Sequence, residues 1–276
     1  FHSAADLYMR IITFDALRCL DIPGVHYIKP EQYLNHLPEI AQAEWVLFPE
    51  YWQVNALYYG LGARLFPSIA SYHIGHDKIE QTRAFQLACP NNIPDTQILE
   101  NSPENTERLW DDLVTPFVAK DPRSSEGRGV FLVEERRQWR DYCAQSPVLY
   151  VQELLPIDRD LRLVLVGKKV VAGYWRLQSP DGFHNNVAQG GTLDFSPLPA
   201  SAVQLVEQVA HRLDLDHGGF DVAMVGNHPY IIEYNRLCGN QGLVEQGIRI
   251  GAMINDHLLT AGHSATCAHE QERKKQ

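Results

Sequence analysis

The first 67 residues alternate short β-rich apolar runs with longer runs that have the spacing of amphipathic helices. The β-rich runs are RIITF (10–14), VHYIK (25–29), WVLF (45–48) and RLF (64–66), and the helix-like runs are 30–43 and 51–62. Strands that alternate with helices in this way are typical of a parallel sheet. We therefore predict a small α/β domain over residues 1–67.

A second, longer block of strands and helices follows. Residues 68–88 have the pattern of a loop that leads into a helix, and the segment CPNNIPDT (89–96) then interrupts regular structure. Strands are predicted at 116–120, 130–134, 149–154, 161–167, 168–177 and in a hairpin over 220–235, and helices at 135–145, 201–215 and 246–262. The charged end AHEQERKKQ predicts a solvated, disordered tail.

Composition excludes several classes of partner. The chain has 276 residues, 45% of them hydrophobic, and its formal net charge is -10. Such a charge gives no overall attraction to duplex nucleic acid or an anionic membrane, although a locally basic cleft stays open. No apolar stretch approaches the roughly 18 residues of a membrane span, and the first residues lack the layout of a secretory signal. We therefore expect a cytoplasmic protein, and the five widely spaced cysteines, none in a CxxC pair, to be reduced.

Lys120 ends an apolar run and is followed by a loop that contains Ser124, Ser125 and Gly127. A Ser- and Gly-rich loop between strands can bring backbone N–H groups close to phosphate oxygens, while a nearby lysine supplies a positive charge. The loop is not a Walker A motif, because no GK[ST] sequence follows. The alternative is an ordinary hairpin tip.

Asp221, Glu233 and Asn235 lie on the two arms of the predicted hairpin. A three- or five-residue loop near 225–229 would place Asp221 opposite Glu233 and put Asn235 on the same face, whereas an even loop would separate them. Oxygen donors of this kind suit magnesium or manganese bound with nucleotide phosphates. The alternative is a solvated hairpin face.

Several charged residues lie beside or within strongly apolar strands: Glu153, Asp158, Arg159, Asp160, Arg162 and Arg176. Polar groups in such strands need partners or must face a cleft. Paired arginines can neutralise the charge of a transferring phosphoryl group. A structural salt bridge between Asp160 and an arginine is the alternative.

Four sequence blocks, taken in order and spacing, resemble the ATP-grasp superfamily and, within it, the RimK-like glutamate ligases. They are FVAK with SSEGRGV, YVQELLPIDRDLRLVLVGKKVVAGYWR, FHNNVAQGG and GGFDVAMVGNHPYIIEYNRLCGNQGL, and the resemblance extends from Ser68 to Ile254. It implies an α/β (α+β) ATP-grasp fold, in which two α+β subdomains sandwich ATP behind the small N-terminal domain. We therefore predict an ATP-grasp domain over 68–265, divided into subdomains 68–155 and 156–265, with the tail at 266–276.

The resemblance also implies roles for individual residues. Lys78 and Lys120 would contact phosphates, Glu153 and Leu154 the adenine, and Asp160 the ribose. The loop with Ser124, Ser125 and Gly127 would close over the triphosphate, and the block with His184, Asn185 and Asn186 would lie near the phosphates and metal. Asp221, Glu233 and Asn235 would hold two Mg²⁺ ions, with Mn²⁺ as an alternative metal. Arg176 would stabilise the phosphorylated carboxylate and the tetrahedral intermediate, and Arg162 matches the second position of the family's D-x-R block.

The implied activity is a magnesium- and ATP-dependent carboxylate–amine ligase that adds an amino acid to an amino acid, a peptide or a protein terminus. Three residues depart from the family pattern: His184 and Gln189 stand where arginines are usual, and Cys238 replaces a proline. These departures leave the glutamate preference open. The alternatives are an ATP-grasp kinase or a catalytically silent nucleotide-binding regulatory module. Partners are expected to be carboxylate and amine substrates and, by analogy with related ligases, a second copy of the chain.

Overall fold

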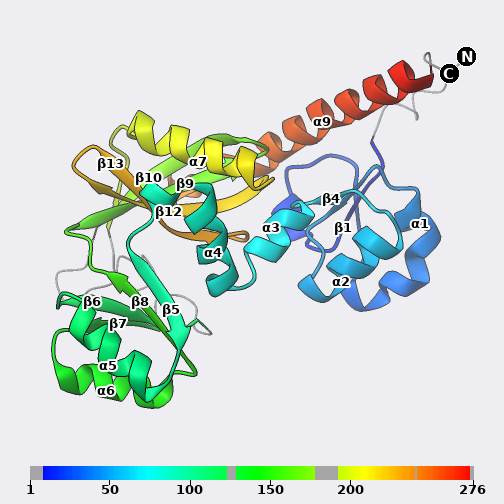
Figure 1. Cartoon of the computed structure of the whole chain (residues 1–276). Coiled ribbons are helices and arrows are strands. Elements are labelled where there is room, and N and C mark those ends of the chain that lie inside the picture. Colours follow the sequence, from blue (N-terminus) through cyan, green and yellow to red (C-terminus); the bar gives the residue numbers. More distant parts are fainter. Residues whose placement is uncertain (1–8, 123–128, 178–191, 240, 274–276) are drawn as a thin grey trace, which may run out of the picture.

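The structure is a computed structural model, which describes residues 9–122, 129–177, 192–239 and 241–273, the segment 262–273 by its backbone alone (Figure 1). Its strands form three sheets. No described helix combines the length and the apolar composition needed to cross a membrane.

The N-terminal sheet contains four strands in the order β2-β1-β3-β4, and all of its pairs are parallel. The strands are β1 (Ile11–Thr13), β2 (Val25–Tyr27), β3 (Trp45–Leu47) and β4 (Leu65–Phe66). Each falls within a β-rich run of the sequence, so the predicted parallel arrangement is confirmed. The apolar residues of β1 and β3 are buried, because a parallel sheet is covered on both faces.

The helices of this unit are shorter than the sequence predicts. The segment 30–43 divides into a 3-10 helix, η3 (Pro30–His36), and α1 (Leu37–Ala41), and the short 3-10 helix η2 (Leu17–Cys19) precedes β2. Pro38 lacks the N–H that a continuous helix would donate to the preceding turn, which explains the break. The segment 51–62 begins as α2 (Tyr51–Asn55) and continues as a π-helical turn, η4 (Ala56–Gly60).

The second sheet is antiparallel, with the order β5-β8-β6-β7. Its strands are β5 (Thr96–Glu100), β6 (Phe117–Lys120), β7 (Val130–Val133) and β8 (Val148–Glu153). Helices α5 (Pro103–Asp112) and α6 (Arg136–Gln145) pack on it through Leu109 and Trp139, both of which are fully buried. The sequence pattern predicted α6 but not β5 or α5, each of which contains only two apolar residues, Ile98 and Leu99 in β5 and Leu109 and Trp110 in α5.

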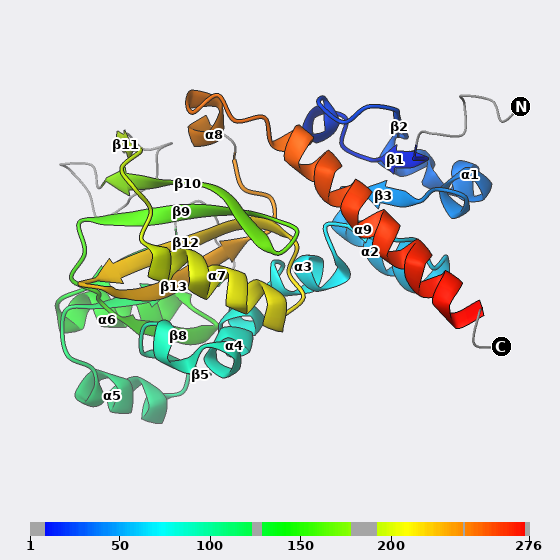
Figure 2. The same ribbon diagram turned by 90° about the horizontal axis from the view of Figure 1, so that it is seen from above.

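The third sheet is also antiparallel, with the order β11-β10-β9-β12-β13. Its strands are β9 (Arg159–Val166), β10 (Lys169–Leu177), β11 (Thr192–Asp194), β12 (His217–Val225) and β13 (His228–Asn235). Helices α4 (Lys78–Ala88) and α7 (Ala200–Arg212) lie against one face, where Leu163, Val206 and Phe220 belong to a common core (Figure 2). Since side chains alternate along a strand, the neighbours of these core residues point to the opposite face.

The C-terminal helices return the chain to its beginning. After α8 (Gln241–Glu245), helix α9 (Ile250–Arg273) packs Ile254 and Leu258 against Trp45 and Phe66 of the N-terminal unit (Figure 2). Helix α9 extends through residues 266–273, which the sequence pattern assigned to the tail. The segment contains no proline and is rich in Ala, Glu and Gln, which favour a helix.

Packing of α9 predicts a clear difference between two adjacent leucines. Leu258 is fully buried, whereas Leu259 is 39% exposed. Leu258→Ala should lower the free energy of unfolding by about 2–5 kcal/mol, because it leaves a cavity, and Leu259→Ala by less than about 1 kcal/mol. Urea denaturation of the two variants measures this. Equal losses would contradict the packing of α9 against the N-terminal unit.

Candidate functional site

Two arginines and two aspartates meet on the face of the third sheet that lies opposite α7. Arg162 on β9 stands beside Asp221 on β12, and Asp160, two residues earlier on β9, stands beside Arg176 on β10. Arg162 donates from Nε to Asp221 Oδ1 at 2.5 Å and from Nη2 to Oδ2 at 3.2 Å. Arg176 donates to both oxygens of Asp160, at 2.8 and 2.7 Å, and its Nη2 lies 3.0 Å from Asp221 Oδ2. The four side chains therefore form one connected, largely buried charge network.

The network favours the charged forms of Asp221, Arg162 and Arg176, whereas burial raises the pKa of Asp160 despite its bonds to Arg176. Burial alone would raise the pKa of Asp221, but Arg162 and Arg176 together bring it below its ordinary value. Burial opposes the charge of Arg176, yet Asp221 and Asp160 raise the pKa of that guanidinium. An arginine that is fixed by two carboxylates and remains charged is preorganised to meet negative charge at this face.

The hairpin places Asp221 directly opposite Glu233, as the sequence analysis predicted for an odd loop. The connecting turn is nevertheless even, because Val225 pairs with His228 and only two residues lie between them. A register shift corrects this: Val222 pairs with Ile231 and Asp221 with Glu233, so the intervening Ile232 is an extra residue. A β-bulge of this kind reverses the side-chain directions beyond it.

Asn235 follows two residues later on β13, opposite Gly219. Three oxygen-bearing side chains thus lie at one end of the β12–β13 pair. Carboxylate and amide oxygens are the donors that Mg²⁺ prefers.

Two lysines reach this end of the sheet from other elements. Lys78 is the first residue of α4, a helix whose N-terminus Asp77 caps, and its Nζ lies 2.9 Å from Glu233 Oε1. Lys120 ends β6 in the second sheet and is buried. The pKa of Lys120 is lowered to about 8, chiefly by burial; the negative charges of Glu233 and Asp221 oppose this shift, and the positive charge of Lys78 adds to it. Lysines from α4 and the second sheet therefore converge on the carboxylates of the third.

Lys120 predicts a pH dependence of stability. Its pKa is about 8 in the folded chain and about 10.5 when exposed, so between these values the unfolded chain binds more protons. Stability due to this group should therefore rise with pH across that window, by on the order of 2–3 kcal/mol. Urea denaturation at pH 8 and pH 10 should show a smaller rise, or a larger fall, for Lys120→Met than for the parent chain. The same pH dependence in the parent chain and in Lys120→Met would contradict a lowered pKa for Lys120.

The family follows from the sequence of the same region. Residues 77–258, which contain α4, both antiparallel sheets and every charged residue of the network, match the model of the RimK-like ATP-grasp domain. The chain belongs to this family. Its resemblance to RimK-like proteins is thereby confirmed.

Curated relatives of this RimK-like chain are 28–30% identical to it over the aligned residues. A probable alpha-L-glutamate ligase of Shewanella halifaxensis is 30% identical over 187 residues, which are 62% of the chain and 40% of that protein. The ribosomal protein bS6--L-glutamate ligase of Escherichia coli O139:H28 is 28% identical over 214 residues, 71% of either protein. The chain spans about two fifths of the length of the Shewanella relatives.

Solved structures confirm the ATP-grasp fold. The RimK domain protein ATP-grasp from Sphaerobacter thermophilus superposes with a TM-score of 0.67 at 17% identity, over 90% of this chain and 98% of that one. The D-alanine--D-alanine ligase of Bacillus anthracis gives 0.69 at 13% identity, over 95% and 100%. The ATP-grasp ligase PsnB, complexed with a minimal precursor, Mg and ADP, gives 0.68 at 14% identity, over 93% and 98%.

The residues that the sequence predicts to bind the adenine and the ribose of ATP lie on or next to the second and third sheets of this ATP-grasp chain. Glu153 is exposed at the end of β8, where its Oε1 accepts a hydrogen bond from the backbone N–H of Asp95 at 2.8 Å, and the half-buried Leu154 follows it. Asp160 is engaged at both oxygens by Arg176, so the salt bridge that the sequence analysis named as its alternative is present. Six predicted residues lie outside the described part of the chain: Ser124, Ser125, Gly127, His184, Asn185 and Asn186.

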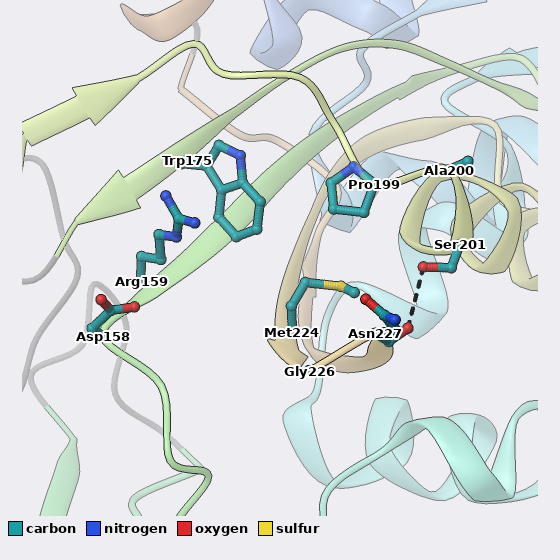
Figure 3. A pocket seen from close by; sticks show the side chains of 9 residues that line it. All are labelled: Asp158, Arg159, Trp175, Pro199, Ala200, Ser201, Met224, Gly226 and Asn227. Carbon is teal, nitrogen blue, oxygen red and sulfur yellow. Dashed lines mark hydrogen bonds between the residues drawn. The ribbon is translucent and has the colours of Figure 1, made fainter.

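A cavity of about 490 Å³ opens on the α7 side of the third sheet, beside the turn between β12 and β13 (Figure 3). On one side, Arg159 Cζ lies 4.3 Å from the ring centroid of Trp175. On the other, the Ser201 hydroxyl near the start of α7 donates a hydrogen bond to the Asn227 carbonyl oxygen. Trp175 and Arg176 are consecutive on β10, so the cavity and the charge network are on opposite faces. The cavity contains none of the predicted ATP or metal residues.

Sequence reasoning missed two further arginines that lie close to the network. Arg236 follows Asn235 directly, and Arg18 comes from η2 of the N-terminal unit and reaches the carbonyl of Cys238. Proximity to Asn235 was a signal for Arg236. Nothing in the sequence connects Arg18 to residues more than 200 positions away, because that contact depends on how the N-terminal unit packs.

Proposed function

We propose that the chain is a Mg²⁺- and ATP-dependent carboxylate–amine ligase that forms an amide bond through an acylphosphate. The observation that carries this proposal is the convergence of three oxygen donors with cations from separate elements. Asp221, Glu233 and Asn235 supply the donors on β12 and β13, while Lys78 and Lys120 approach from α4 and β6. Such a set suits phosphoryl transfer, which depends on positioning and charge neutralisation.

The residues fit magnesium and a triphosphate. Asp221 and Glu233 are directly opposed on neighbouring strands, and both now neutralise cations of the chain itself. Two carboxylates that face each other repel unless positive charge lies between or beside them. The arginines and Lys78 supply this positive charge here, and a bound divalent cation would supply part of it. When bound, a magnesium ion held by Asp221, Glu233 and Asn235 would withdraw negative charge from the phosphate oxygens.

The chain's own residues then have separable tasks. Lys78 and Lys120 would neutralise phosphate oxygens, and Lys120 would gain a partner for its buried ammonium. Arg176 would meet the charge that develops when a substrate carboxylate accepts the phosphoryl group and when the amine later attacks. Asp160 orients Arg176 by holding its Nε and Nη2, and Arg162 orients Asp221.

The substrate class is proposed from the relatives. Their names describe glutamate ligation, in one case to ribosomal protein bS6, and beta-citrylglutamate synthesis in another. These names support an amino acid as one substrate and an amino acid, peptide or protein terminus as the other. The predicted roles of Glu153 and Leu154 at the adenine and of Asp160 at the ribose remain predictions.

Product analysis tests the proposed function. The chain is incubated with Mg²⁺, ATP and pairs of amino acids, and ADP, phosphate and amide products are measured together. We expect ADP release to depend on the carboxylate, and an amide to form only when an amine is present. A stable phosphorylated product that accumulates without amide would instead identify a kinase, and ADP release that no substrate stimulates would contradict ligation.

A further inference from the structure

Arg236 is a half-buried cation that lacks a partner of opposite charge within the described residues. Its guanidinium lies 4.7 Å from the ring centroid of Tyr72 and 5.9 Å from that of Tyr51. Its Nε is shielded from solvent and makes no hydrogen bond with any described group. A shielded donor without an acceptor costs free energy, so this N–H is available for an acceptor that arrives from outside.

The backbone around Arg236 is closely packed and fixes where the side chain starts. A Cβ on Gly75 would come within 2.9 Å of Arg236 Cβ, and one on Gly218 would come within 2.6 Å of the Asn235 carbonyl oxygen. Arg236 is therefore held between the α3–α4 connection and the end of β13, with α3 spanning Ile69–Ile74. It follows the proposed metal ligand Asn235 by one residue, so its backbone adjoins the proposed metal site.

Arg18 approaches the same border from the N-terminal unit. Its Nη1 lies 3.5 Å from the carbonyl oxygen of Cys238, two residues after Arg236. Its Nε forms an ion pair with Asp15 Oδ2 at 3.2 Å, is shielded from solvent and makes no hydrogen bond with any described group. Both arginines act electrostatically on the Tyr72 hydroxyl, where they oppose the effect of burial on its pKa. Two guanidiniums from distant parts of the chain thus surround one buried tyrosine.

Cys238 connects this pair to the charge network. A Cβ on Gly219 would lie 2.8 Å from both Cys238 Cβ and Arg162 Cδ, so these two side chains are neighbours. Positive groups therefore continue from Arg176 and Arg162 to Arg18. In the network both arginines already have carboxylate partners, whereas Arg236 has none within the described part of the chain.

We propose that Arg236, assisted by Arg18, holds the non-reacting carboxylate of an amino acid substrate. The inference rests on the proposed function and extends it to substrate recognition. A carboxylate can accept two parallel hydrogen bonds from a guanidinium, including one from Nε, which satisfies the donor that is now unpaired. Lys78 on α4 and Lys120 on β6 would bind the phosphates, whereas Arg236 and Arg18 would bind the carboxylate. Phosphate binding and carboxylate recognition therefore involve different side chains.

Binding without turnover tests this subsite. The chain is saturated with Mg²⁺ and the non-hydrolysable nucleotide AMPPNP, and L-glutamate, L-glutamine and glutamate α-amide are titrated by calorimetry. Arg236→Gln should weaken L-glutamate binding at least tenfold, because a charged hydrogen bond is lost, and Arg236→Lys should restore part of it. Arg18→Gln should have a smaller effect in the same direction. AMPPNP affinity should stay within twofold in every variant.

Arg83→Gln removes an exposed arginine of α4 and is the matched control, with no expected effect. If Arg236 holds the α-carboxylate, Arg236→Gln should weaken the binding of glutamate and of glutamine alike. If Arg236 holds the side-chain carboxylate, the substitution should weaken the binding of glutamate and of glutamate α-amide but not that of glutamine. Unchanged affinities in Arg236→Gln would overturn the subsite. Nucleotide binding without amino acid binding by the parent chain would also overturn it but leave the proposed function standing, whereas failure to bind the nucleotide would overturn both.

Discussion

Replacing Asp221 with asparagine should reduce turnover at least about 100-fold, because the change replaces a proposed carboxylate ligand of Mg²⁺ with a neutral amide and removes the negative charge that balances two arginines. The carboxylate is buried, and Arg162 and Arg176 both bond to it. Removing one member of a buried ion network leaves charge uncompensated, so the free energy of unfolding should also fall, by about 3–5 kcal/mol. Urea denaturation and an ADP-release assay measure the two effects separately.

A partner variant separates chemistry from stability. Glu233 is about one quarter exposed and pairs with Lys78, so Glu233→Gln should cost less than about 1 kcal/mol of stability yet lose turnover to a similar degree. Asp194→Asn, on the edge strand β11 of the same sheet, is the control and should leave turnover unchanged. Near-parental turnover in both Asp221→Asn and Glu233→Gln would exclude the metal assignment.

Arg176→Lys should lower kcat about 100-fold while AMPPNP binding changes little. Lysine keeps the charge but cannot hold both oxygens of Asp160 and still reach Asp221, as the planar guanidinium does. The lost interaction is one that strengthens as charge develops, so the effect should fall on kcat rather than on nucleotide affinity. Steady-state kinetics and calorimetric binding of AMPPNP distinguish the two.

The control for Arg176→Lys is Arg159→Lys. Arg159 lies on the same sheet but is exposed, stacks over Trp175 and pairs with Asp194 on the cavity face. The Arg159→Lys variant should have a kcat within about twofold of that of the parent chain. A kcat for Arg176→Lys within threefold of the parent would show that Arg176 has a structural role only.

Local pattern predicted much of the secondary structure. The strands at the N-terminus, the two strands β9 and β10 and the β12–β13 hairpin follow from β-branched runs bounded by turn residues. α5 was missed although Ser102 and Pro103 are a helix start signal. β5 could not be predicted, because its two apolar residues form a strand only by pairing with β8.

The candidate site shows the same division. Its residue types were readable from the sequence, because carboxylates and arginines inside apolar strands must find partners. Their pairing was not: the even turn at residues 226–227 would have separated Asp221 from Glu233 without the bulge at Ile232. The bulge keeps Ile231 and Tyr234 in the core that packs on α7, and a requirement of that kind is set by the whole sheet.

The sequence by itself determined the order of elements, the chemical types at the site and, through its ordered motifs, the family. Only the tertiary structure decided that α9 packs on the first sheet, that Arg176 binds both Asp160 and Asp221, and that Arg18 reaches the carbonyl of Cys238. The physical reason is the range of the interactions. Turn residues and alternation act over a few positions, whereas packing and charge pairing join residues that are distant in the chain and meet only when the sheets have formed.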